Sequence, residues 1–260
     1  QLFPYKKLES DFLVSIYKIW SVSLAVLAIF FSQEASATRK VLVLFGNYID
    51  PNNQVALMAV GSGLCLYSFF KTAGKRKLLE GVGFLICAFS IFQCGSRSGI
   101  VILAAQIIIV LFFLRDRRCK PAKTIFKWIS ILAFIVVAFY LMRQFLPQNI
   151  IDRLLGLGDL EFTDGTGRTE RWAEGFKHFL DHPIFGCGWG AYECHNTFLT
   201  FLVDLGILGN IPFYIVLCSL GIKAIKERNV VVLLLLATGL LPGVLVGAQN
   251  RRFFWNAFIL

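Results

Sequence analysis

The chain has 260 residues, of which 57% are hydrophobic and only 16% are charged. An ordinary soluble domain carries about 25% charged residues, so this composition excludes a typical soluble protein. The formal net charge of +10 would indicate a nucleic-acid partner in a soluble chain. Here the placement of the basic residues explains the charge by membrane topology, and no nucleic-acid partner is predicted.

Seven apolar segments reach or approach the length of about 17–25 residues that a helix needs to cross a bilayer. Lipid offers the backbone no hydrogen-bond partner, so such segments must be helical, and they lack the alternating pattern of membrane β-strands. The predicted fold is all-α, a polytopic transmembrane helical bundle that forms one membrane domain over residues 1–260. The predicted spans are Phe12–Phe31, Gln54–Phe70, Leu79–Cys94, Gly99–Leu114, Ile125–Leu141, Thr197–Leu220 and Val230–Ala248.

The two ends of the sequence favour a piece of a longer protein. An eighth apolar segment begins at Phe253 and is cut off after a few residues. The chain also begins with Gln1 and not with Met. We therefore expect a fragment.

The apolar run from Leu79 to Leu114 is too long for a single span. As one helix it would measure about 54 Å at 1.5 Å per residue, whereas the hydrocarbon core is about 30 Å thick. The run must therefore turn. The turn is predicted at Gly95–Gly99, which has a glycine at each end.

The basic residues fix the predicted orientation. With seven spans, four basic clusters fall on one side, which the positive-inside rule identifies as the cytoplasm. The outer face of the cell membrane then carries Ser32–Asn53, the Gly95–Gly99 turn and the extracytoplasmic loop 143–196, with Arg39 and Lys40 as exceptions to the rule. The four clusters are Lys6–Lys7, Lys71–Lys77, Arg115–Lys127 and Lys223–Arg228.

The extracytoplasmic loop is the one sizeable segment predicted outside the membrane. Within it, Thr169–Asp181 is expected to form a short amphipathic helix that ends at His182-Pro183, because large apolar residues recur at helical spacing. The loop carries more acidic than basic residues. An anion site there would therefore depend on individually placed arginines.

Three arginines near the predicted outer surface could bind an anion. Arg97 lies in the tight turn between two spans, where it either anchors the turn by extending toward the interface or binds a phosphate through its planar guanidinium. Arg168 and Arg171 lie at the start of the amphipathic helix, where the helix N-terminus favours anions. The alternative is a solvated first turn in which Arg171 pairs with Glu170 or Glu174.

His195-Asn196 opens the sixth predicted span, directly after a glycine-rich stretch. Histidine titrates near neutral pH and is the commonest general base, although a lone histidine is more often structural. His178 and His182 are interpreted as structural. Asp204 lies within the same span, where an acid usually faces a cavity or a partner.

Lys18, in the first span, raises the same question, and the sequence does not identify its partner. The two intramembrane charges, Lys18 and Asp204, are the features that would fit a transporter or flippase. The seven cysteines show no metal-ligand spacing, so neither a metal nor a cofactor is predicted. Cys187 and Cys194 both lie on the predicted outer side, and an oxidising environment there would permit a disulfide that closes the glycine-rich stretch, which we state as a hypothesis.

Five short motifs occur in a familiar order. The chain resembles the O-antigen ligase / O-antigen polymerase family of bacterial membrane glycosyltransferases over roughly Asp50 to Gly209. The motifs are DPNN at Asp50–Asn53, GSRSG at Gly95–Gly99, GTGRTERW at Gly165–Trp172, HPIFGCGWG at His182–Gly190 and HNTFLTFLVDLGILG at His195–Gly209.

This resemblance implies metal-independent transfer of a glycan from a polyprenyl-pyrophosphate carrier. The acceptor would be lipid A–core sugar in a ligase or another glycan chain in a polymerase. The resemblance assigns the pyrophosphate contacts to Arg97 and Arg168 and the base to His195. Arg171 is a plausible helper at the same site. Substrate binding is further predicted at Asn196 and Asp204.

The sequence also departs from the family pattern. Only four residues, Ala191–Cys194, separate Gly190 from His195, whereas the family usually has a longer insert there. Helices that members carry before the DPN turn are absent. A glycan-binding subunit without catalysis and a flippase are the two rival interpretations.

Overall fold

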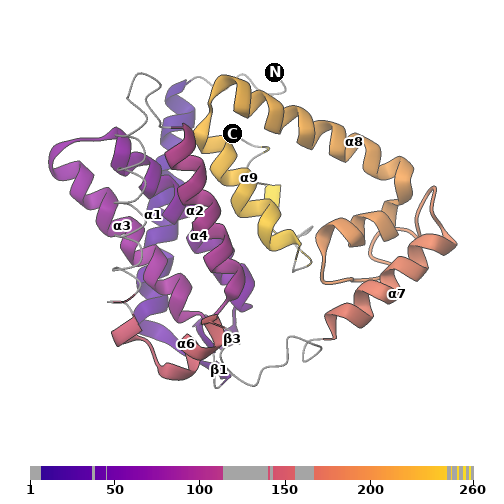
Figure 1. Cartoon of the computed structure of the whole chain (residues 1–260), viewed down its shortest axis with the longest axis horizontal. Coiled ribbons are helices and arrows are strands. Elements are labelled where there is room, and N and C mark those ends of the chain that lie inside the picture. Colours follow the sequence, from indigo (N-terminus) through magenta and orange to yellow (C-terminus); the bar gives the residue numbers. More distant parts are fainter. Residues whose placement is uncertain are drawn as a thin grey trace. The chain divides into compact units, whose positions relative to one another are not determined.

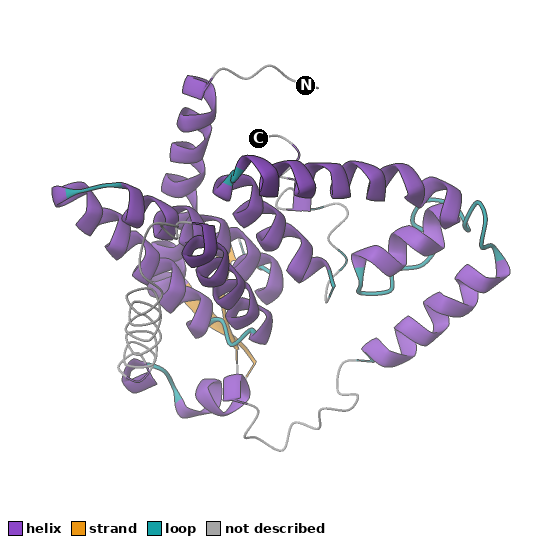
Figure 2. Ribbon diagram, turned by 45° about the horizontal axis from the view of Figure 1, so that its top comes forward, coloured by secondary structure: helices purple, strands orange, loops and turns teal. Residues whose placement is uncertain are grey.

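The computed structural model describes residues 7–36, 39–44, 46–113, 140, 143–155, 167–244, 247, 251, 254, 255 and 258. These residues are mainly helical, and their three strands are short (Figure 2). The chain divides into two compact units. We call Leu13–Gly158 the N-terminal unit, and Gln1–Phe12 together with Asp159–Leu260 the C-terminal unit.

The order of elements follows the predicted spans where the structure describes them. The N-terminal unit contains α1 (Lys7–Phe31, which begins in the other unit), β1 (Ser32–Ser36), β2 (Arg39–Leu44), β3 (Asn47–Tyr48), α2 (Pro51–Lys71), α3 (Gly74–Gln93), α4 (Arg97–Phe113), the 3₁₀ turn η1 (Arg143–Phe145) and α6 (Gln148–Leu155). The C-terminal unit contains α7 (Arg168–Asp181), α8 (Thr197–Glu227) and α9 (Val230–Gly243).

Within the described residues, three helical stretches are long and apolar enough to cross a bilayer: Asp11–Phe31, Pro51–Lys71 and Thr197–Glu227. Two further apolar helices, Arg97–Phe113 and Val230–Gly243, are shorter. The prediction of a mainly helical membrane protein is confirmed, while the number of spans stays a prediction. The predicted span Ile125–Leu141 lies almost wholly outside the described residues.

Helix α2 is the centre of the N-terminal unit and packs against both α3 and α4 (Figure 1). Small residues on α2 permit this close packing. A Cβ at Gly61 would lie 2.5 Å from the Cβ of Ser21 on α1, and one at Gly63 would lie 2.9 Å from Nε2 of Gln106 on α4.

The all-α prediction missed a small antiparallel sheet in which β2 lies between β1 and β3. The sheet is attached to α2, because the backbone N–H of Leu42 donates to Oε1 of Gln54 at 2.7 Å. Val41 and Leu42 are both 1% exposed. A short, buried and partly β-branched run was the available signal for a strand.

The predicted turn between the third and fourth spans is confirmed in position, since α3 ends at Gln93 and α4 begins at Arg97. Gly95 has a φ of +65°, a backbone conformation that glycine adopts without strain. Gly99 has a different role from the one predicted. It lies inside α4, where a Cβ would collide with Ile91 and Val55.

In the C-terminal unit, α7 and α9 each pack against α8. The predicted amphipathic helix is confirmed as α7, which ends at the cap residue His182. Phe254 is 1% exposed and forms ring contacts with Phe201 and Phe213 of α8. Arg228 and Asn229 join α8 to α9, and the Asn229 side chain accepts from the N–H of Val232.

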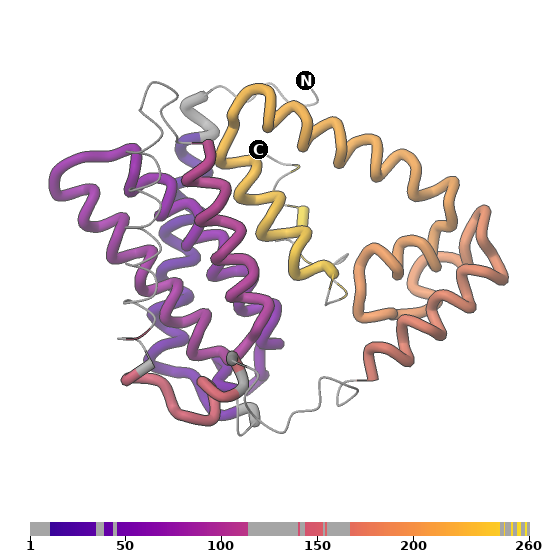
Figure 3. The backbone as a smooth tube through the Cα atoms, viewed as in Figure 1, coloured from indigo at the N-terminus to yellow at the C-terminus, as the bar shows by residue number. Residues whose placement is uncertain are grey.

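The predicted span Thr197–Leu220 contains a break that was not predicted. Helix α8 starts at Thr197 as expected but is broken at Gly206, where φ is 61° and ψ is −169°. Figure 3 shows the resulting change of direction within the orange part of the tube. The uninterrupted part of α8 therefore begins only after Gly206.

Candidate functional site

The first motif, at Asp50–Asn53, forms the beginning of α2. The Asp50 carboxylate accepts hydrogen bonds from the backbone N–H groups of Asn52 and Asn53 at 2.9 and 3.0 Å. This is an N-cap, in which a side-chain oxygen satisfies N–H groups that the first turn leaves without partners. Pro51 follows at the first helical position, where its fixed φ suits a helix start.

The second motif, at Gly95–Gly99, is bonded directly to the first. Oδ1 of Asn52 accepts a hydrogen bond from the Ser96 hydroxyl at 2.8 Å, and the Ser98 hydroxyl lies 3.4 Å from the same oxygen. The two hydroxyls are 2.7 Å apart. Asn52, Ser96 and Ser98 are all at least nine-tenths buried, so the starts of α2 and α4 form one polar junction.

Arg97 is the exposed residue of this junction. It is the first residue of α4 and lies between the buried serines. Because its neighbours are fixed by hydrogen bonds to Asn52, the position of the Arg97 backbone is fixed as well. A second cation, Arg39 at the start of β2, lies within electrostatic range of the Cys94 thiol at the end of α3.

The third motif begins α7. Gly167 has a φ of 57° and Arg168 is the first helical residue. The N–H of Arg171 donates to the carbonyl of Gly167 at 3.1 Å, which closes the first turn. Arg168 is half-buried and Arg171 is exposed. The structure thus places both predicted arginines at one helix N-terminus.

Helix α7 is held against the start of α8 by a tight contact between Gly175 and Cys194. A Cβ at Gly175 would collide with the Cys194 sulfur, which is fully buried. The N–H of Cys194 donates to Oγ1 of Thr200 at 3.2 Å. The arginines of α7 and the histidine before α8 are therefore joined through one packed contact.

The hypothesised disulfide is not formed, since Cys187 and Cys194 are both free. The two thiols have different partners. The Cys194 sulfur packs on Gly175, whereas the Cys187 thiol donates to the carbonyl of His178 at 3.5 Å.

A second contact with α7, made by Tyr192, fixes the segment before His195. The Tyr192 hydroxyl donates to Oε2 of Glu174 on α7 at 2.7 Å, and its ring lies 5.0 Å from that of His178. The hydrogen bond to Glu174 raises the pKa of the Tyr192 hydroxyl, and nearby Arg171 opposes this shift. This places Arg171, Glu174 and Tyr192 together, and the predicted structural role of His178 agrees with its ring contact.

His195 has an unusual backbone and a carboxylate partner. Its φ is 51°, in the left-handed region that few non-glycine residues adopt but where His is enriched. Nδ1 of His195 lies 3.6 Å from Oε1 of Glu193, and the two side chains are 38% and 58% exposed. The next residue, Asn196, caps α8 by accepting from the N–H groups of Phe198 and Leu199 at 3.0 and 3.1 Å.

The fourth motif supplies hydrogen-bond partners for the backbone groups that the break in α8 leaves unpaired. At Gly206 the carbonyls of Val203 and Asp204 lose their normal donors, the N–H groups of Ile207 and Leu208. Unpaired backbone groups are costly in lipid, and here all four find partners in the segment Pro183–Gly188. The bonds are Cys187 N–H to Val203 O at 2.8 Å, Gly188 N–H to Asp204 O at 3.0 Å, Ile207 N–H to Pro183 O at 2.9 Å and Leu208 N–H to Ile184 O at 3.1 Å.

Asp204 is only 2% exposed. Its Oδ2 accepts the backbone N–H of Gly190 at 2.9 Å, while its Oδ1 has no hydrogen-bond partner among the described residues. One oxygen of the carboxylate thus holds the glycine-rich segment in place. Its predicted contact with substrate stays a prediction.

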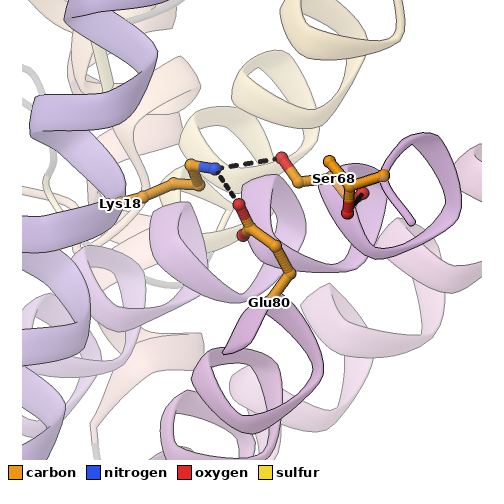
Figure 4. Close-up of polar contacts among 4 residues, drawn as sticks. Lys18, Ser68 and Glu80 are labelled. Atoms are coloured by element: carbon orange, nitrogen blue, oxygen red, sulfur yellow. Dashed lines mark hydrogen bonds and ion pairs between the residues drawn. The ribbon is translucent and has the colours of Figure 1, made fainter. Parts of the chain in front are cut away.

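The partner of Lys18 is Glu80. Nζ of Lys18 lies 2.5 Å from Oε1 of Glu80 and donates to the Ser68 hydroxyl at 3.1 Å (Figure 4). The two charged side chains are 13% and 10% exposed. A buried ion pair thus joins α1, α2 and α3 within the N-terminal unit.

The structure therefore gathers most of the predicted residues, but not all of them. Arg97 belongs to the N-terminal unit, whereas the others lie along the α7–α8 junction of the C-terminal unit: Arg168, Arg171, His195, Asn196 and Asp204. Sequence analysis did not select Glu193 or Asn52 as site residues, although Asn52 belongs to the first motif and Glu193 lies two residues before His195. Within the described residues, no group of three His, Cys, Asp or Glu side chains could hold a metal ion.

The long apolar helices are those of a membrane protein. A family model described as O-antigen ligase matches residues 82–214, just over half of the 260 residues. The chain belongs to the O-antigen ligase family, and the resemblance seen in the sequence is confirmed. The match includes four of the five motifs and leaves out Asp50–Asn53. No curated protein and no solved structure matches the chain significantly.

Proposed function

We propose that this protein transfers a glycan from a polyprenyl-pyrophosphate carrier to a saccharide acceptor on the outer face of the cell membrane. Membership of the O-antigen ligase family supports glycan transfer of this general type. The observation that carries the proposal is the α7–α8 junction, where the helix whose first turn bears Arg168 and Arg171 packs through Gly175 against the segment that leads to His195.

In the proposed reaction, the acceptor hydroxyl oxygen forms a bond to the anomeric carbon of the donor. The bond between that carbon and the pyrophosphate oxygen breaks, and polyprenyl pyrophosphate leaves with the electron pair. Arg97 and Arg168 stabilise the developing negative charge, an effect that is often the largest catalytic contribution. Arg171 assists them.

His195 takes the proton of the attacking hydroxyl. A general base contributes about 10²–10⁴-fold to a rate. Asn196 uses its side-chain oxygen to cap α8, so contact with the acceptor would fall to its amide NH₂. Asp204 would act on substrate through the glycine-rich segment that it holds, and through its second carboxylate oxygen.

The proposed acceptor is lipid A–core sugar in a ligase or a glycan chain in a polymerase, and the donor tail and the protein share the same membrane. The predicted orientation supports the outer face, because it places the basic clusters in the cytoplasm. No cofactor or metal is part of the proposed mechanism.

A purified-protein assay with lipid-linked oligosaccharide and acceptor tests this proposal. We expect release of polyprenyl pyrophosphate and a lengthened acceptor. His195→Ala and Arg97→Ala should each abolish transfer while the protein still accumulates in the membrane. Full activity in both variants would overturn the mechanism.

The same assay addresses the flippase and binding-subunit alternatives, since neither releases polyprenyl pyrophosphate. The contacts of the two intramembrane charges favour the enzyme. Lys18 is neutralised by Glu80, and Asp204 holds a backbone N–H, so neither charge needs a transport pathway to account for it.

A further inference from the structure

Among the residues that the structure describes, Glu193 is the carboxylate that pairs with the proposed base, and the segment that carries it is well fixed. Tyr192, just before it, is bonded to Glu174 of α7. Cys194, just after it, is fully buried and bonded through its N–H to Thr200 of α8. A residue held between two such anchors has little freedom of backbone position.

The backbone of His195 is also held in an uncommon state. A left-handed conformation of a non-glycine residue costs of order 1–3 kcal/mol and persists where the surroundings impose it. Here the Asn196 cap on one side and buried Cys194 on the other impose it. The result is that the His195 ring and the Glu193 carboxylate lie next to each other, with Nδ1 3.6 Å from Oε1.

The other carboxylates around this segment have different partners. Glu174 accepts the Tyr192 hydroxyl, and Asp204 accepts the N–H of Gly190. Glu193 is thus the acid placed to act on the imidazole. A carboxylate at Nδ1 selects the tautomer that carries its proton there, which leaves the lone pair of Nε2 free to accept a proton. It also stabilises the imidazolium that forms.

We propose that Glu193 is a positioning residue for His195, which it orients so that Nε2 faces the acceptor hydroxyl. This inference rests on the proposed function. The 3.6 Å separation fits a pair that closes to a hydrogen bond when substrate is bound, since catalytic hydrogen bonds are often long in the free enzyme. The alternative is an exposed ion pair with no effect on the reaction.

The test compares Glu193→Gln and Glu193→Asp with the wild type. Glu193→Gln should lower kcat by part of the roughly 10²–10⁴-fold contribution of a base and leave KM for the donor unchanged. Glu193→Asp, which keeps the carboxylate, should restore part of the loss.

Glu227→Gln is the matched control, because it removes an exposed carboxylate that also pairs with a cation, Lys223 at 3.9 Å. It should leave kcat unchanged. A second measurement is independent of activity. The chain has three histidines, so ¹⁵N NMR with the acceptor bound can report the His195 tautomer, which should carry its proton on Nδ1 in the wild type and shift toward Nε2 in Glu193→Gln.

Wild-type kcat in Glu193→Gln or an unchanged tautomer would each overturn the inference. Failure of the proposed function has a different signature, which is full activity in His195→Ala itself. The two results are therefore distinguishable.

Discussion

Gly186 and Gly206 face each other in the C-terminal unit so closely that neither position has room for a side chain. A Cβ on Gly206 would lie 2.5 Å from the backbone nitrogen of Gly186, and a Cβ on Gly186 would lie 2.5 Å from that of Gly206. Both residues have positive φ, at 75° and 61°. This contact allows the glycine-rich segment to take up the hydrogen bonds that the break in α8 releases, and it joins two sequence motifs into one structure.

Gly206→Ala should therefore destabilise the protein and abolish glycan transfer. The φ of 61° and ψ of −169° lie in a region that is essentially restricted to glycine, with a cost of order 1–3 kcal/mol for other residues, and the collision adds to it. The thermal midpoint of the detergent-solubilised protein and the transfer rate are the measurements.

Gly221→Ala is the control for this substitution. Gly221 lies in the same helix, and nothing is within 4 Å of the Cβ it would gain. Alanine in a helix interior is favoured over glycine by about 1 kcal/mol, so this variant should be neutral or slightly stabilising. An equal loss of stability in both variants would contradict the proposed contact.

The buried pair of Lys18 and Glu80 predicts a non-additive pair of substitutions. Glu80→Met alone should cost about 3–5 kcal/mol of stability, because it leaves the Lys18 charge buried without its partner. Lys18→Met combined with Glu80→Met should recover most of that loss, since apolar side chains can replace a buried pair. Thermal unfolding of the single and double variants measures the coupling.

The control is the ion pair Lys223–Glu227, in which both side chains are 58% exposed. Glu227→Gln should change the free energy of unfolding by less than about 1 kcal/mol. The double variant of Lys18 and Glu80 should also keep glycan transfer. Loss of transfer in a double variant that remains folded would show that the pair contributes to the reaction and not only to stability.

Asn52 predicts a link between the first motif and Arg97. Asn52→Ala removes the acceptor of the Ser96 hydroxyl and should cost about 1–3 kcal/mol, the range for a lost partner of a buried polar group. It should also lower transfer by the folded protein, because the start of α4 positions Arg97. Ser62→Ala is the control, since Ser62 joins α2 to Gln106 of α4 at 2.7 Å away from Arg97. It should reduce stability but not the transfer rate of the folded fraction.

The sequence predicted well what local chemistry determines. The apolar segments predicted α1, α2 and the start of α8, and the helical spacing of apolar residues predicted α7. Each of these patterns depends only on whether the side chains of that one segment are buried or face lipid. It failed where distant segments determine the structure. Gly206, Gly209 and Pro212 weaken a helix locally, but they do not show that the helix breaks at Gly206. The hydrogen-bond partners that stabilise the break lie in a separate segment, Pro183–Gly188.

In the candidate site, too, local features could be predicted from the sequence and contacts between distant segments could not. Arg168 and His195 could be selected from residue type and position, but the packing of α7 on α8 depends on Gly175 facing Cys194, which no local pattern reveals. Glu193 was not predicted as a site residue, because its proposed role depends on the 3.6 Å distance between its carboxylate and His195. That distance is set by the anchors at Tyr192 and Cys194 and by the backbone of His195.

The environment of Cys194 yields a chemical prediction. Burial raises the pKa of its thiol, although the Thr200 hydrogen bond opposes this. Since the thiolate is the reactive form, Cys194 should resist a maleimide at pH 7 in the native protein, while half-buried Cys187 reacts. Peptide mass mapping of the alkylated protein distinguishes the two sites, and a Cys187→Ser variant confirms the assignment.

After unfolding without reductant, both cysteines should be alkylated, because both are free. Protection of both in the unfolded protein would instead indicate a disulfide. Gly175→Ala should accelerate native alkylation of Cys194, because the added methyl group displaces the sulfur from α7. If α7 and the segment before His195 act together in catalysis, this variant should also slow glycan transfer in proportion to the exposure of Cys194.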